Sequence, residues 1–203
     1  MARQNRVTPE SRIIADPARG DRMGNRGVLH DEDGNIVAPV RHRNWVCCVL
    51  RFKDRRRTIM RPGCYTELFF LDEATALSAG HRPCGECRRA DYERFRAAWA
   101  LATGTLPSAK EMDAALHPAR VVPRRRTQVT HEADMAALPD GAFIRWQDRP
   151  ALVLGDTLRP WTPSGYDPAV ARPARGSVTV LTPAPTIAVL RAGYRPALHA
   201  TAG

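Results

Sequence analysis

The segment LSAGHRPCGECRR, residues 77–89, places Cys84 and Cys87 on a predicted tight turn with two residues between them, and this turn is called the knuckle below. A C-x-x-C pair of this kind can be a redox couple, a disulfide or half of a metal site. A thioredoxin-type couple needs a βαβ context and little else, whereas three further cysteines lie upstream here, at positions 47, 48 and 64. Zinc takes four donors and readily accepts thiolate sulfur. The spacing therefore favours a metal site over a redox couple.

The composition fits a globular protein of the reducing cytoplasm. The chain has 203 residues, of which 43% are hydrophobic, so it can bury a core as one domain or as one domain with an appendage. The longest apolar runs, at 45–50 and 186–190, fall far short of the roughly 20 residues that a membrane span requires. The N-terminus contains arginines but lacks the apolar stretch of a secretory signal. We therefore expect a cytoplasmic protein whose five cysteines are ligands or free thiols rather than disulfides.

The residues around the C-x-x-C pair resemble a known zinc-binding module. FFLDEATALSAGHRPCGECRR, residues 69–89, is similar in order and spacing to the C-terminal half of the Ada-type module, which belongs to methylphosphotriester repair. Upstream, MRPGC at 60–64 resembles the C-x-P-x-C segment of that family. Residues 1–44 and 105–203 are not covered. The resemblance implies a cysteine-bound zinc ion and a role on DNA, in repair or regulation.

The resemblance also assigns individual positions. It places Cys64, Cys84 and Cys87 on three of the four ligand positions, and Met60 where the first cysteine of the family stands. In the Ada repair protein that first cysteine accepts a methyl group from a DNA phosphotriester. A methionine thioether has no acidic proton and already carries a methyl group. We therefore expect no Ada-type methyl transfer by this chain.

The fourth donor must come from outside the matched segment. Cys47 and Cys48 lie on one predicted strand with alternating side chains, so only one of them can face a given site. In order of preference, the candidates for the fourth donor are Cys48, Cys47, His117 and His42. The predicted Zn²⁺ ligands are therefore Cys48, Cys64, Cys84 and Cys87. The alternative is that no metal binds and the cysteines are buried thiols.

The charge points to a polyanionic partner. The net charge is +10, and residues 1–63 contain 14 basic and 7 acidic side chains, whereas residues 127–203 contain 7 and 6. A basic face attracts phosphate polyanions through counterion release, so nucleic acid, DNA first, is the expected partner. Two arginine clusters are candidates for sequence-independent phosphate contacts: Arg55, Arg56 and Arg57, and Arg124, Arg125 and Arg126. The alternative is that both clusters are solvated turns.

A catalytic function is a second hypothesis. Asp113 and His117 stand four residues apart on one face of a predicted helix, and Arg120 follows three residues later. A histidine oriented by an aspartate can act as a general base, and a nearby arginine can stabilise a phosphate ester. The chain would then be a metal-dependent or Asp/His phosphoester-processing enzyme. A solvated helix face explains the same pair, and a structural or partner-binding protein is the third hypothesis.

The pattern of elements predicts an α+β fold with a small zinc-knuckle core and a C-terminal antiparallel β unit. We expect three helices. The first is capped by Asp72 and stopped by Gly80, and the second ends at Gly104. The third begins with a Ser108–Glu111 capping box and is closed by Pro118. Strands are expected as a pair within 44–60, and at 141–146, 150–156, 177–183 and 186–194. The predicted organisation is 1–44, mostly loop with one hairpin; 45–126, the Ada-like zinc region with two helices; and 127–203, a small β-rich unit.

Overall fold

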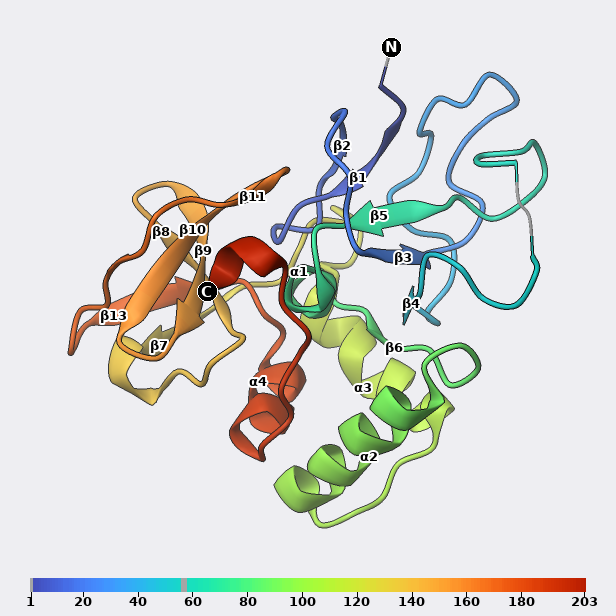
Figure 1. Cartoon of the computed structure of the whole chain (residues 1–203). Helices are drawn as coiled ribbons and strands as arrows, with labels where there is room; N and C mark the ends of the chain where they lie inside the picture. Colours follow the sequence, from blue (N-terminus) through green and yellow to red (C-terminus); the bar gives the residue numbers. More distant parts are fainter. Residues whose placement is uncertain (1, 56–57) are drawn as a thin grey trace.

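The computed structural model describes residues 2–55 and 58–203, and in this part of the chain the fold is α+β, which confirms the predicted class (Figure 1). A mixed six-stranded sheet is built from the N-terminal half, and a separate seven-stranded antiparallel sheet lies toward the C-terminus. None of the helices described here is long and apolar enough to cross a bilayer.

The six-stranded sheet has the order β2-β1-β5-β3-β4-β6. Its strands are β1 (Gln4–Val7), β2 (Ile13–Ala15), β3 (Arg22–Asn25), β4 (Val46–Cys48), β5 (Leu68–Phe70) and β6 (Arg82–Pro83). The segment 1–44 thus supplies a β1–β2 hairpin and one further strand, β3. At the opposite edge β4 pairs with β6 in parallel, and this pair carries the cysteines of interest.

The second strand predicted within 44–60 is wrong for the residues that are described. Only β4 forms, and the chain after it runs through turns in which Lys53 and Met60 have positive φ values of 53° and 57°. Left-handed backbone interrupts an extended run, so the polar stretch around Lys53 leaves the sheet.

The seven-stranded sheet has the order β11-β10-β9-β8-β13-β7, with β12 paired to β10. Its strands are β7 (His131–Asp134), β8 (Phe143–Trp146), β9 (Arg149–Leu154), β10 (Thr157–Thr162), β11 (Gly165–Tyr166), β12 (Val170–Ala171) and β13 (Ser177–Val180). Three of the four predicted C-terminal strands are confirmed as β8, β9 and β13. The fourth, at 186–194, is wrong, because a helix begins at Ala184 with Pro185 in its first turn, and Ile187 and Leu190 bury one helical face.

The helices are α1 (Glu73–Ser78), α2 (Arg89–Thr103), α3 (Ala109–Arg120) and α4 (Ala184–Arg191), with short 3₁₀ turns at Met135–Ala137 and Ala200–Ala202. The predicted caps are confirmed: the Asp72 side chain accepts from the Thr75 amide, Gly104 is left-handed, and Ser108 forms a capping box with Glu111. Pro118 does not close α3, which continues for two residues to Arg120.

Three hydrophobic clusters organise the described part of the chain, and one of them packs Ala74 of α1 against Phe143 and Leu152 of the seven-stranded sheet. Side chains of α2, α3 and α4, including Phe95, Leu116 and Leu190, pack with Ile144 and Val153 of the seven-stranded sheet. The third cluster joins the six-stranded sheet to α1, which contacts strands of both sheets and lies between them in Figure 1. The predicted segments 45–126 and 127–203 therefore share two of these clusters, and α1 contributes side chains to all three.

Candidate metal centre

Parallel pairing of β4 with β6 brings two distant stretches of sequence together. Val46 is in register with Arg82, and Cys47 with Pro83, so Cys48 and Cys84 follow as neighbours at the ends of the two strands. The Cys84 amide donates to the Cys47 carbonyl at 2.9 Å, which continues the pairing by one residue. After Cys84 the chain turns through Gly85 and Glu86 and returns with Cys87 just before α2 begins at Arg89.

Three cysteines meet at this point. The sulfurs of Cys48, Cys84 and Cys87 all lie within 4.8 Å of one another, and all three residues are half-buried. Such a group can hold a metal ion, and three thiolate sulfurs are a donor set suited to zinc. No fourth cysteine, histidine, aspartate or glutamate among the described residues joins the group. The arrangement therefore supplies three of the four donors of a tetrahedral site.

Hydrogen bonds to sulfur stabilise negative charge in this group. The Glu86 amide donates to Cys84 Sγ at 3.4 Å. Hydrogen bonds from the Cys48 and Cys87 thiols, supported by the Glu86 and Cys87 amides, hold the pKa of Cys84 well below its ordinary value. The same contacts with Cys84 and Cys87, together with burial, raise the pKa of Cys48. The first thiolate therefore forms easily, whereas the second forms only with difficulty because the two negative charges repel each other. A bound cation would remove that repulsion.

The neighbouring Cys47 lies outside the group. Its side chain is fully buried and accepts a hydrogen bond from Arg88 Nη1 at 3.3 Å. Burial raises the pKa of Cys47 to about 12, so it stays a neutral thiol. Alternation along β4 thus directs Cys48 toward the knuckle and Cys47 into the core.

The other predicted ligands are also placed outside the group. Cys64, which the resemblance put on a ligand position, is half-buried and accepts from Arg61 Nε at 3.3 Å. His42 is exposed in the loop before β4, where its Nδ1 accepts from the Asn44 amide. His117 lies on α3, and neither histidine belongs to the described ligand group.

A small cavity borders the three sulfurs. Its volume is about 200 Å³, and its lining combines the three cysteines with apolar side chains and a few charged ones. Glu67 is buried in this wall, with a carboxylate oxygen that accepts from the Met60 amide at 2.8 Å. Glu86, also in the lining, forms an ion pair with Arg55 at 2.7 Å. The sulfurs therefore face a space large enough for water or a small donor.

A buried ion-pair network next to Cys87 holds the knuckle in place. Arg88 directly follows Cys87, and its Nη2 lies 2.7 Å from Glu73 and 2.7 Å from Asp91. Glu73 is fully buried at the start of α1, where it also accepts from the Tyr194 hydroxyl at 2.6 Å and from the Ala197 amide at 2.9 Å. The network thereby connects the knuckle, α1 and the C-terminal segment. Glu73 and Arg88 were not among the predicted site residues, and their only local signal is their place within residues 69–89.

Among the described residues, no hydrogen bond joins Asp113 and His117, the predicted catalytic pair. Both oxygens of Asp113 are bound by Arg82, at 3.0 Å to Nε and 2.6 Å to Nη2, and both side chains are buried. His117 is half-buried, and burial, with repulsion from Arg120 and Arg43, lowers its pKa. The Asp113 carboxylate thus holds Arg82, which precedes the knuckle on β6. A catalytic role for Asp113 and His117 stays a prediction.

The two arginine clusters differ in what the structure describes. Arg55 is exposed and paired with Glu86, and Arg56 and Arg57 lie outside the described residues. Arg124, Arg125 and Arg126 are exposed in the turn after α3, with positive φ at Arg124 and Arg126. All three side chains of the second cluster are therefore open to solvent, and their contact with phosphate stays a prediction.

Comparison with known protein families, curated proteins and solved structures finds no match to this chain. The chemistry of the site consequently rests on its own geometry.

Replacing Cys64 by serine should leave the metal content unchanged, because its sulfur lies outside the group of three. We expect the same zinc-to-protein ratio as in the parent chain, by elemental analysis, and a melting temperature within about 2 °C. Loss of zinc in Cys64→Ser would instead show that Cys64 is a zinc ligand, as the resemblance implies.

Proposed function

We propose that this chain is a zinc-binding, nucleic-acid-associated protein of the reducing cytoplasm, without Ada-type methyl acceptor activity. The observation that carries the proposal is the convergence of Cys48, Cys84 and Cys87 from two separate stretches of sequence. Zinc bound there would fasten the end of β4 to the knuckle and to the start of α2. Structural zinc contributes directly to the free energy of folding, so the metal would hold this edge of the sheet together.

The association with nucleic acid rests on charge. Most of the basic excess lies in residues 1–63, and the described part of the chain exposes Arg55 and Arg124 to Arg126. Arginine binds phosphate through two parallel donors and stays charged at any physiological pH. Contacts of this kind are independent of sequence and supply affinity that depends strongly on salt.

A salt titration of DNA binding tests this part of the proposal. If about five arginines contact phosphates, the slope of log affinity against log salt should be near −4 to −5. Changing Arg55, Arg56 and Arg57 together to alanine should reduce the slope by up to about three, and Arg149→Ala, in an exposed ion pair with Asp167, should leave it unchanged. If the chain fails to bind DNA or RNA even at low salt, it has no nucleic-acid partner and the structural or partner-binding hypothesis takes over.

A metal-dependent enzyme is the second candidate, and one observation favours it. Catalytic zinc sites keep three protein ligands and an open fourth position, and the three sulfurs here border a cavity that Glu67 also lines. Cobalt substitution separates the two candidates. A visible spectrum that changes when a small thiol is added indicates an open position, whereas an unchanged spectrum indicates a closed structural site.

A further inference from the structure

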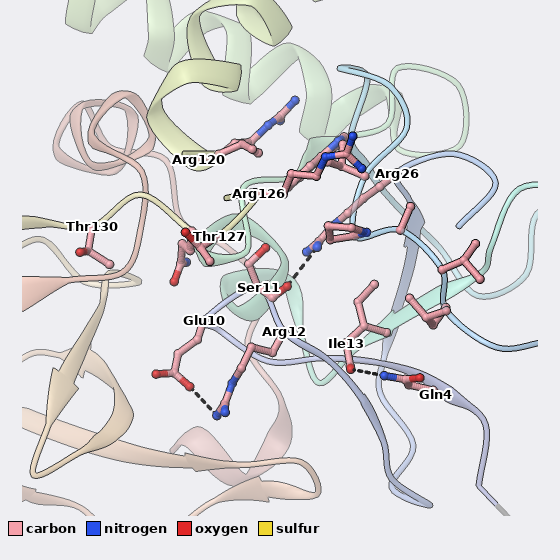
Figure 2. A pocket seen from close by; sticks show the side chains of 18 of the residues that line it. Gln4, Glu10, Ser11, Arg12, Ile13, Arg26, Arg120, Arg126, Thr127 and Thr130 are labelled. Atoms are coloured by element: carbon pink, nitrogen blue, oxygen red, sulfur yellow. Dashed lines mark hydrogen bonds and ion pairs between the residues drawn. The ribbon is translucent and has the colours of Figure 1, made fainter. Parts of the chain in front are cut away.

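A second cavity, which shares no lining residue with the one at the cysteines, carries a strong positive charge. Its volume is about 870 Å³, and it opens between the β1–β2 hairpin, the loop at 36–40 and the segment that follows α3 (Figure 2). Among its described lining residues only Glu10 is acidic. The basic residues of the lining are Arg12, Arg26, Arg120, Arg126 and Arg145.

Two of these arginines are buried. Arg26 and Arg120 are each only 1% exposed, and their guanidinium carbons lie 4.3 Å and 4.2 Å from the ring of Trp45. Arg26 follows β3, whereas Arg120 is the last residue of α3, so tertiary structure alone brings them to the same indole. Gly80 makes room for the second of them, since a Cβ there would lie 2.6 Å from Arg120 Cδ.

Neither guanidinium has an acidic partner within ion-pair distance among the residues that the structure describes. Arg26 Nη1 donates to the Ser11 carbonyl at 3.0 Å, and Arg26 Nε donates to His81 Nε2 at 3.4 Å. Arg120 Nη1 donates to the Gly80 carbonyl at 2.6 Å, and Arg120 Nη2 donates to the Arg43 carbonyl. Arg26 Nη2 and Arg120 Nε, although buried, have no hydrogen-bond partner in this part of the chain. A buried charge without a counterion costs several kcal/mol, and unused donors add to that cost.

The pKa values of both buried arginines are lowered. Burial lowers the pKa of Arg26 to about 9, and repulsion from Arg120 contributes to this. Burial also lowers the pKa of Arg120 to about 9, against the attraction of the Asp113 carboxylate, which is itself bound by Arg82. An anion placed in the cavity would relieve both effects.

The entrance of the cavity adds further donors. Figure 2 shows Arg26 reaching Ser11 inside the cavity, with Glu10 and Arg12 at one end and Arg126 at the other. Glu10 is shared between Arg12, at 2.8 Å, and Arg145, at 2.9 Å, so one carboxylate serves two guanidinium groups. Arg126 is exposed at the rim. The surplus of positive charge is thus present at the rim as well as at the back.

We propose that this cavity is a binding site for the phosphate group of a nucleotide-sized phosphorylated molecule. The donors of several arginines exceed what the two oxygens of a carboxylate can accept, and they suit the oxygens of a phosphate. The volume lies in the range of small-molecule sites. The residues from Ile36 to Val40 give the cavity one apolar wall, against which the organic part of the ligand packs.

The same phosphate chemistry has two sources. A free nucleoside monophosphate would occupy the cavity as a small ligand, whereas a phosphodiester of single-stranded nucleic acid would place one nucleotide there. The second source rests on the proposed association with nucleic acid, and the first does not.

Calorimetric titration of the zinc-loaded full chain tests the site with three probes: inorganic phosphate, a nucleoside monophosphate and a short single-stranded oligonucleotide. We expect the monophosphate to bind more tightly than inorganic phosphate, because the apolar wall contributes. Preference for the oligonucleotide assigns the cavity to nucleic acid, and preference for the monophosphate assigns it to a small ligand.

Two variants show that binding occurs in this cavity. Arg26→Met should weaken binding of the monophosphate by about tenfold or more, while the ligand-free protein melts at an equal or higher temperature, because an uncompensated buried charge is removed. Arg126→Ala, at the exposed rim, should weaken it by about two- to fivefold without affecting folding. Arg149→Met, in an exposed ion pair with Asp167, is the matched control and should change nothing.

The proposal is overturned if the parent chain binds neither phosphate nor monophosphate at millimolar concentration, or if Arg26→Met and Arg126→Ala both bind as the parent does. Should DNA binding persist in either case, the proposed function stands and its phosphate contacts lie elsewhere. Should the monophosphate bind while DNA does not, the cavity stands and the nucleic-acid association fails.

Discussion

Replacing Glu73 by alanine should lower the free energy of unfolding by about 3–5 kcal/mol, the usual result of removing one partner of a buried ion pair. The change leaves Arg88 without its partner on α1 and removes the acceptor of the Tyr194 hydroxyl and the Ala197 amide. Urea unfolding of the zinc-loaded protein measures the effect.

The control for Glu73 is an ion pair of similar length at the surface. Arg89 lies 2.6 Å from Glu93, and their side chains are 69% and 40% exposed. Arg89→Ala should therefore cost less than about 1 kcal/mol. Equal losses for Glu73→Ala and Arg89→Ala would show that the buried network does not hold the C-terminal segment to the knuckle.

Cys84→Ser should produce the second large effect, a fall in melting temperature on the order of 10 °C. Cys84 is one of three mutually adjacent sulfurs, and a site with two remaining thiolates should lose its zinc. Several kcal/mol of folding free energy would be lost with the metal, and each kcal/mol corresponds to about 2–4 °C in a chain of this size.

Chelation separates the metal from the side chain. The parent protein, stripped of zinc, should melt close to Cys84→Ser, and zinc should restore the parent but not the variant. If stripped and zinc-loaded parent proteins melt at the same temperature, the metal contributes nothing to the fold.

Local interactions were predictable from the sequence. The caps at Asp72, Gly104 and Ser108 depend on contacts within four residues, and each was found as predicted. The α+β class followed from the order of periodic segments in the same way. The apolar run at 186–194 was misread, because a short apolar run fits a buried helix as well as a strand.

Long-range pairing explains what the sequence could not show. Whether Cys48 or Cys64 joins the knuckle depends on the register of β4 against β6, which no local pattern determines. Similarly, Asp113 looked like a partner for His117, but the fold presents Arg82 to it. The meeting of Arg26 and Arg120 at Trp45 involves three separate elements, so the anion site had no signal in the sequence.

Elemental analysis of the chain purified with zinc present, alongside Cys48→Ser, measures whether the three sulfurs hold the metal. We expect one zinc ion per parent chain and almost none in Cys48→Ser, because Cys48 is the donor that only the fold brings to the knuckle. A parent chain without zinc, or a Cys48→Ser chain that retains a full equivalent, would contradict this expectation.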